Sequence, residues 1–197
     1  RLKERIAYLI PRQKLLIMSS IMANVNYEGP LQFDDEWRLI QTELIDVLVG
    51  VLDGTLDPKQ MTIGIYTSAY TKCFKLSTPP HNLTHELYRK HGQTIENYLV
   101  QTVLPALRAI NGRDGPILLR ELQRRWKNHK AMNRWLQKCL SNLDRFHCKH
   151  NDVPLLEDVG MTLFKRHIYD EIKVDTTSAI LSLINQEREG EIIDKTL

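Results

Sequence analysis

The sequence predicts an all-α fold, and three observations support this prediction. Apolar residues recur along most of the chain at the i, i+3, i+4 spacing of an amphipathic helix. Few stretches alternate between apolar and polar residues with the period of two that marks a β-strand. The 9 glycines and 8 prolines of this 197-residue chain fall between the periodic segments, where they separate one helix from the next.

The first two helices are predicted between Asp34 and Thr78. The acidic run 34–36 suits a helix N-terminus, the apolar positions from Trp37 to Val51 follow at helical spacing, and Gly54 closes the helix. Asp57 is a good N-cap with Pro58 in the first turn, so a second helix is expected to follow them and to end at 78–80, Thr-Pro-Pro.

The third helix is predicted to begin near Asn82 or Thr84, and Pro105 either kinks or ends it. A turn is expected at 111–115. Pro116 then opens a fourth helix, and the pattern hardly pauses up to residue 149, which leaves open a junction of two helices near Asn128. The fifth helix is expected to bury the following apolar residues: Met132, Leu136, Cys139 or Leu140, Leu143 and Phe146.

The last two helices follow a break at 151–152, Asn-Asp. Pro154 is expected to start a sixth helix that runs through Ile168. Asp175 or Thr176 is expected to cap a seventh helix, which stops at Gly190.

The composition indicates a globular intracellular protein. Charged residues make up 26% and hydrophobic residues 42%, close to the globular average, and the net charge is only +3. The odd number of cysteines, 3, favours a reducing compartment. No stretch approaches the roughly 18 apolar residues that a membrane span requires, so no membrane partner is expected.

The sequence holds no strong signature of catalysis or of metal binding. The densest group of metal-capable side chains is 147–150, His-Cys-Lys-His, but a zinc site needs about four ligands and a second cluster is missing. Phosphate-binding glycine loops and a His-Glu-x-x-His motif are also missing. We therefore expect no catalytic residue, no metal and no cofactor.

Charge is unevenly distributed along the chain. Residues 118–149 carry nine basic and two acidic residues, a local net charge of +7, whereas residues 28–57 carry eight acidic residues and one basic residue, a net charge of −7. The basic segment could hold nucleic-acid phosphates, steer an acidic protein partner or form a solvated face. Because it lacks interleaved stacking aromatics, a nucleic-acid-binding helical module is the alternative function and not the first one.

Six motifs, in the same order, resemble the N-terminal region of cullins, the scaffolds of multisubunit ubiquitin ligases. They are Trp37, IYTSAYTKC at 65–73, HELYRKHGQTIENYL at 85–99, RELQRRWKNHKAMNRWL at 120–136, SNLDRF at 141–146 and EREGEIID at 187–194. Within the family, TPPHN at 78–82, TVLPALR at 102–108 and LLREL at 118–122 are most similar to the plant-type cullin-1 branch of SCF ligases.

The resemblance implies a fold and a domain organisation. The fold would be an α-solenoid-like cullin stalk, with an N-terminal extension at 1–30, a first five-helix cullin repeat at 31–150 and the truncated start of a second repeat at 151–197. The chain would be a non-catalytic scaffold segment, located in the nucleus and cytoplasm. A RING-box protein would bind only the C-terminal region, which is absent from this sequence.

The resemblance also implies partners and a binding surface. The branch binds a Skp-family adaptor that carries an F-box protein, and no nucleic acid. The adaptor-binding positions carried over to this chain are Thr62, Ile63, Tyr66, His129, Ala131, Met132 and Arg134. Tyr66 is expected to be the exposed anchor, because an exposed Tyr offers a large apolar area with few rotamers to immobilise, and Tyr70 is expected to face the core. Thr62 and Asn142 depart from the family pattern, which has aromatic residues there.

Overall fold

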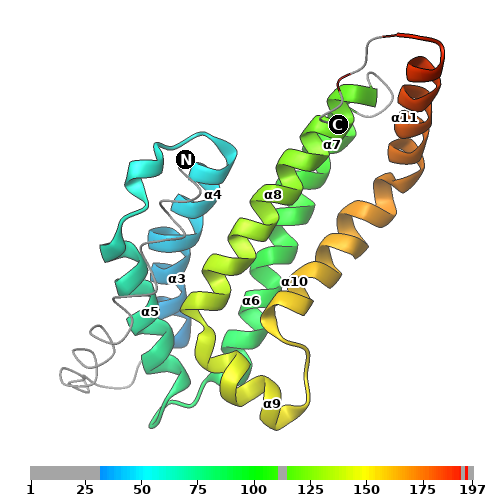
Figure 1. Cartoon of the computed structure of the whole chain (residues 1–197). Coiled ribbons are helices and arrows are strands. Elements are labelled where there is room, and N and C mark those ends of the chain that lie inside the picture. Colours follow the sequence, from blue (N-terminus) through cyan, green and yellow to red (C-terminus); the bar gives the residue numbers. More distant parts are fainter. Residues whose placement is uncertain (1–31, 111–114, 192–193, 195–197) are drawn as a thin grey trace.

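The computed structural model describes residues 32–110, 115–191 and 194. These residues form helices joined by short loops, with no β-strand among them, which confirms the all-α prediction (Figure 1). The expected extension at 1–30 and all but the last residue of the expected turn at 111–115 lie outside the described residues.

The first helix follows the prediction closely. It comprises α3 (Phe33–Ile40), a π-helical turn (Gln41–Ile45) and α4 (Asp46–Asp53), which run on without a break. Acidic residues occupy its first turn, where they complement the helix dipole. Gly54 ends it in the left-handed conformation with φ of 80°, a conformation that costs glycine no steric strain.

The second helix, α5 (Ile63–Ser77), begins later than Asp57 and Pro58 predict. Those two residues start a separate 3-10 turn (Pro58–Gln60), in which the Asp57 carboxylate accepts a hydrogen bond of 2.8 Å from the Lys59 backbone N–H. The N-cap signal is therefore real but belongs to a shorter element. Thr62 caps α5 by accepting a hydrogen bond of 3.3 Å from the Ile65 backbone N–H.

The third helix continues past Pro105. It comprises α6 (Thr84–Tyr98), a π-helical turn (Leu99–Val103) and α7 (Leu104–Ile110). Proline cannot donate to the carbonyl four residues before it, and the wider π turn directly before Pro105 changes the hydrogen-bond register at that point. Pro105 therefore does not end the helix.

The basic segment forms one long helix, α8 (Gly115–Cys139), without a junction at Asn128. Asn128 instead faces α4, where its side-chain amide donates a hydrogen bond of 2.7 Å to the Leu52 carbonyl. A π-helical turn (Leu143–His147) and α9 (Cys148–Asn151) follow, and Asp152 with φ of 51° ends α9 as expected. Phe146 was expected in the core but is 68% exposed, because the π turn shifts the helical register there.

The last helix is also continuous. It comprises α10 (Leu156–Phe164), a π-helical turn (Lys165–Tyr169) and α11 (Asp170–Arg188). The expected start at Pro154 is two residues early, and the expected break at Asp175 or Thr176 is wrong. Thr176 is a residue type that often caps helices, but here it is buried inside α11 and does not mark a helix end.

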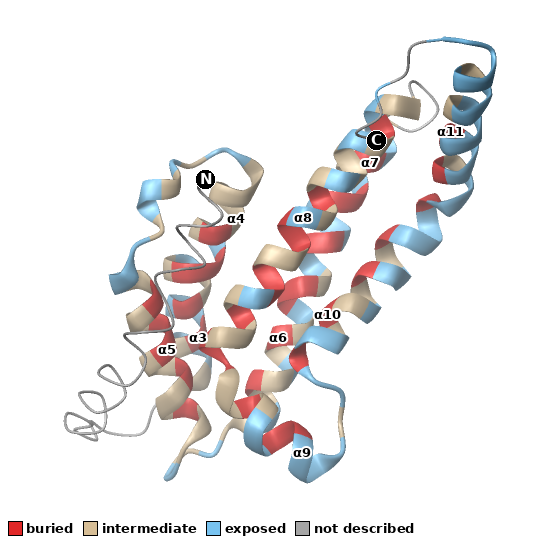
Figure 2. Ribbon diagram, viewed as in Figure 1, coloured by how far each residue is buried: buried red, intermediate tan, exposed pale blue. Residues whose placement is uncertain are grey.

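The helices pack around α8, which contacts α4, α5, α7, α10 and α11. Buried residues (red in Figure 2) line the facing sides of these helices, and α11 extends beyond the compact part of the molecule at the end where α7 also terminates (Figure 2). The largest fully buried side chains are Ile40, Leu44, Ile45, Leu48, Leu76, Leu87, Ile95, Leu99, Leu107, Met132, Leu136 and Leu143. The core thus places α4 and α5 against one side of α8 and α10 and α11 against the other.

Candidate protein-binding site

The start of α5 presents two of the expected adaptor-binding residues to solvent. Thr62 and Ile63 are both exposed, and the Ile63 side chain is 43% accessible. Thr62 has a structural task as the N-cap, which fixes the direction in which the first turn of α5 leaves the loop. An exposed aliphatic residue at a capped helix start is held in place at little conformational cost.

Tyr66 is not the exposed anchor that the family resemblance implies. Its side chain is only 9% exposed, and its ring lies edge-on to Trp135 of α8 at 5.8 Å and stacks on Tyr70 at 6.2 Å. Burial raises the pKa of the Tyr66 hydroxyl well above its ordinary value. Tyr70 is buried as expected. Positions 66 and 70 are one turn apart, so both lie on the same face of α5. The helical period alone could not show that α8 covers Tyr66 as well as Tyr70.

His129 and Met132 also lie in the core, and His129 is on the side of α8 that packs against α10. The His129 Nε2–H donates a hydrogen bond of 3.0 Å to the Gly160 carbonyl, and its ring contacts Trp126 and Phe164. Burial lowers the pKa of His129 to about 4, so the ring is neutral near pH 7. Both residues are fully buried, so neither is exposed on the surface.

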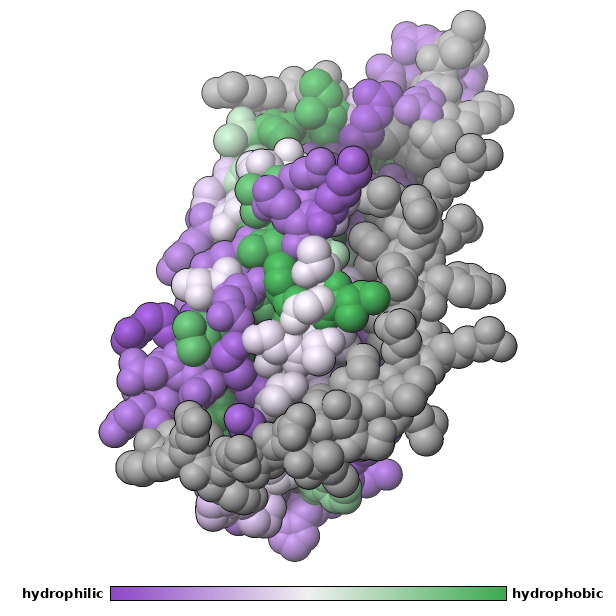
Figure 3. Space-filling model, turned by 90° about the vertical axis from the view of Figure 1, so that its left-hand side faces the viewer, coloured by the Kyte–Doolittle hydropathy of each residue, from purple (hydrophilic) through white to green (hydrophobic). Residues whose placement is uncertain are grey.

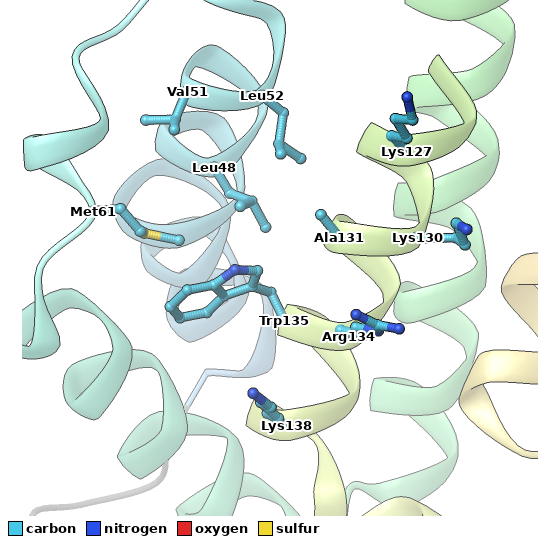
Figure 4. Close-up of a pocket in the computed structure, with 10 residues that line it drawn as sticks. All are labelled: Leu48, Val51, Leu52, Met61, Lys127, Lys130, Ala131, Arg134, Trp135 and Lys138. Atoms are coloured by element: carbon cyan, nitrogen blue, oxygen red, sulfur yellow. The ribbon is translucent and has the colours of Figure 1, made fainter. Parts of the chain in front are cut away.

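Ala131 and Arg134 line an open groove between α4 and α8, which we call the α4–α8 groove. Its volume is about 270 Å³, and it is lined by Leu48, Val51, Leu52, Met61, Lys127, Lys130, Ala131, Arg134, Trp135 and Lys138. Figure 4 shows the apolar residues of α4 and Met61 on one side and α8 on the other, with Ala131 directed toward α4. The Trp135 ring lies at one end, below Leu48 and Met61 (Figure 4).

The two walls of the groove differ in chemistry. The wall formed by α4 and Met61 is apolar, whereas α8 contributes four cations, and none of the described lining residues is a carboxylate. On the side of the molecule that carries α4 and α5, hydrophobic surface is interleaved with strongly hydrophilic surface (Figure 3). The α4 wall could not be told from the core by sequence, because its residues have the same helical pattern as core residues.

A buried ion-pair network fixes α4 against α8 at one end of the groove. Arg125 is 7% exposed and donates to Asp53 at 2.8 Å and to Glu121 at 2.7 Å. The Tyr98 hydroxyl donates to Asp53 at 3.2 Å. These contacts join the acidic and basic segments of the sequence, and they show that Arg125 belongs to the interior and not to a solvated basic face. Because all three charged groups are paired and hydrogen-bonded, the network holds the helices at a fixed separation.

The basic segment is therefore less available to phosphates than its sequence indicates. Arg120, Arg124 and Arg125 are all engaged in ion pairs with carboxylates. His147 and Cys148 of the metal-capable run are buried, and His147 lies 3.1 Å from the Thr84 hydroxyl. Within the described residues, no three His, Cys, Asp or Glu side chains come together as metal ligands.

None of the helices in the described part of the chain combines the length and the hydropathy needed to cross a bilayer.

α-Solenoid proteins stack helices against one another and bind partners along the surfaces that the stack leaves exposed. Comparison with known proteins agrees. Residues 37–197 match the family model of the cullin alpha solenoid domain, and the chain belongs to the cullin family.

Several plant proteins are similar to this chain. It is 38% identical to Cullin-1 of Oryza sativa subsp. japonica over 169 residues, which cover 85% of this chain and 22% of that protein. It is 39% identical to putative cullin-like protein 1 of Arabidopsis thaliana over 167 residues, covering 83% and 22%. Cullin-like protein 3 of Arabidopsis thaliana is 35% identical over 170 residues, covering 85% and 63%. The chain thus spans about a fifth of the length of the first two relatives.

Proposed function

We propose that this chain is the substrate-receptor end of a cullin scaffold and that it binds a Skp-family adaptor carrying an F-box protein. The observation that carries the proposal is the surface formed by the start of α5 and the neighbouring part of α8. Thr62 and Ile63 on α5 and Ala131 and Arg134 on α8 are accessible there, on elements that the core holds rigidly. The similarity to Cullin-1 of Oryza sativa supports this choice of adaptor class.

The buried candidates keep a role in this proposal, but an indirect one. Tyr66 packs on Trp135 and so sets the position of α5 relative to α8, His129 fixes α8 against α10, and Met132 is fully buried in the core. The adaptor would contact the accessible residues, while these three hold the backbone beneath them.

A scaffold of this kind works by geometry. Holding a substrate receptor at one end of a rigid stalk raises the effective concentration of substrate near a ubiquitin-conjugating enzyme at the other end. This chain would supply only the receptor end, and a RING-box protein would bind a region outside it. We also propose that it acts in the nucleus and cytoplasm.

A pull-down with purified proteins tests the adaptor class. The immobilised chain is offered a Skp-family adaptor bound to an F-box protein and, separately, a BTB-domain adaptor. The proposal expects stoichiometric retention of the Skp-family complex and background retention of the BTB-domain adaptor. The reverse preference, or retention of neither, would contradict it. A parallel titration with generic duplex DNA should show weak binding at physiological salt.

A further inference from the structure

The α4–α8 groove has a ladder of cations along one edge. Lys127, Lys130, Arg134 and Lys138 recur at intervals of three or four residues, so they follow one side of α8. At 1.5 Å per residue, the ladder is roughly 17 Å long. Among the described residues, no ion pair engages Lys127, Lys130 or Arg134. The Lys127 ammonium donates a hydrogen bond to the Gln123 side-chain oxygen, and the Lys130 ammonium lies over the Trp126 ring at 5.3 Å.

The opposite wall of the groove is apolar, and its residues are as regularly arranged as the cations of α8. Leu48, Val51 and Leu52 come from one face of α4, and Met61 extends this wall beyond the end of α4. The groove therefore presents an apolar strip and a parallel strip of positive charge, both supported by the Asp53–Arg125 ion pair. A ligand that fills it needs an apolar ridge with carboxylates along one side.

A helix satisfies these demands better than an extended chain. Carboxylates on one side of a helix repeat about every 5.4 Å, the same period as the cations of α8, whereas side chains on one face of a strand repeat roughly every 7 Å. An extended segment in an apolar groove between two helices would find no sheet edge to pair with its backbone, but a helix satisfies its own backbone groups.

From these observations we propose that the α4–α8 groove binds an amphipathic helix of a partner protein that carries acidic residues along one side of its apolar face. The groove meets the surface proposed for the adaptor at Ala131 and Arg134. However, the inference concerns the ligand chemistry of the groove and does not depend on which protein presents the helix.

A set of synthetic peptides tests this assignment on the intact chain. The probe is a fluorescein-labelled 18-residue peptide with leucines at i, i+3, i+4 and i+7 spacing and glutamates on one side. One control peptide replaces every glutamate by lysine, and another replaces every leucine by serine. Fluorescence anisotropy is expected to show that the acidic amphipathic peptide binds about tenfold more tightly than either control. Its affinity should fall as salt rises, because salt screens exposed charge pairs.

Two variants of the chain locate the binding. The double variant Lys130→Glu with Arg134→Glu reverses the charge of part of the ladder at surface positions, and it should bind the acidic peptide about tenfold or more weakly than the parent chain. The exposed charge reversal Lys173→Glu on α11 should leave the affinity for the peptide unchanged. Ala131→Trp should block the groove without altering its charge. Circular dichroism and thermal melting confirm that each variant is folded.

The inference is overturned if the acidic peptide binds no better than its lysine or serine control, or if it binds the folded double variant as well as the parent. Adaptor retention is measured separately by pull-down. A chain that retains the adaptor but not the peptide refutes the groove assignment alone, and one that binds only the peptide refutes the adaptor proposal alone.

Discussion

At the scale of single residues, the structure gives Tyr66 a role in packing and not in direct contact with a partner. The family resemblance implies an exposed anchor, but Tyr66 is enclosed by Trp135 and Tyr70. Tyr66→Ala should therefore lower the free energy of unfolding by roughly 3 kcal/mol or more, because it leaves a cavity between α5 and α8. Tyr66→Phe keeps the ring and should cost much less. Denaturant unfolding measures both, and unchanged stability of the alanine variant would show that the ring is not packed as described.

Two buried histidines predict how stability depends on pH. Burial lowers the pKa of His91 and of His129 to about 4, whereas the ordinary value is 6.5. Both rings are therefore neutral in the folded chain, while the unfolded chain takes up protons as the pH falls below 6.5. Their contribution to stability is complete above pH 6.5 and is lost progressively toward pH 4, by up to roughly 3 kcal/mol for each residue.

The variant His91→Leu isolates one of these contributions. Among the described residues, the His91 ring nitrogens have no hydrogen-bond partner, so an apolar side chain of similar length loses no bond there. Urea unfolding between about pH 7 and pH 5 should give a smaller decrease in stability for this variant than for the parent chain. If the free energy of unfolding falls by the same amount with pH in the variant and in the parent chain, His91 is not buried in its neutral form.

At the scale of elements, helix ends with a local chemical cause were predictable, but continuity was not. Gly54 and Asp152 end helices in the left-handed conformation, as the sequence indicates. By contrast, Pro105, Asn128 and Thr176 look like boundaries but lie inside continuous helices. Asn128 and Thr176 are held there by tertiary packing, and a π turn precedes Pro105. The candidate residues Thr62 and Ile63 could be named from the family resemblance, and both are exposed, whereas the α4 wall depends on how α4 and α8 pack.

The contact between α8 and α10 depends on one glycine. A Cβ atom added at Gly160 would overlap the side-chain amide of Asn133, which is buried. Gly160→Ala should therefore destabilise the chain by about 1–3 kcal/mol, since either the buried Asn133 amide must leave its contact with His129 or α10 must move away from α8.

Gly92 provides the matched control within α6. Among the described residues, a Cβ atom there would meet Val159 at 3.8 Å, an ordinary contact, and nothing nearer. Gly92→Ala should stabilise the chain by about 0.4–1 kcal/mol by reducing the freedom of the unfolded chain. Relative to the parent chain, the melting temperature should fall for Gly160→Ala and rise for Gly92→Ala. A neutral or stabilising Gly160→Ala would disprove the close approach of these helices.

At the scale of the whole molecule, α11 leaves an apolar surface uncovered. Val174 is 72% exposed and Leu181 is 55% exposed, and they stand two turns apart on one side of the helix. In a solenoid such a face packs against the next unit. The isolated chain should therefore self-associate at high concentration and bind a hydrophobic dye, and Val174→Lys with Leu181→Lys should reduce both effects. Sedimentation of the two chains as monomers at every concentration would contradict this expectation.

Adaptor binding through α5 and α8 is the central functional proposal, and Ile63→Asp tests it with little risk to the fold. Ile63 is exposed, and an aspartate in the first turn of α5 suits the helix dipole, so the variant should melt like the parent chain. Loss of a central apolar contact typically costs about 2 kcal/mol of binding free energy, which is roughly thirtyfold in affinity.

The most direct measurement is a calorimetric titration of the Skp-family adaptor and F-box complex into the parent chain, the Ile63→Asp variant and the exposed control Lys173→Glu. The proposal predicts one-to-one binding to the parent chain and to the Lys173→Glu control, and about thirtyfold weaker binding to a fully folded Ile63→Asp variant. Equal affinity for all three chains, or no binding to the parent, would contradict it.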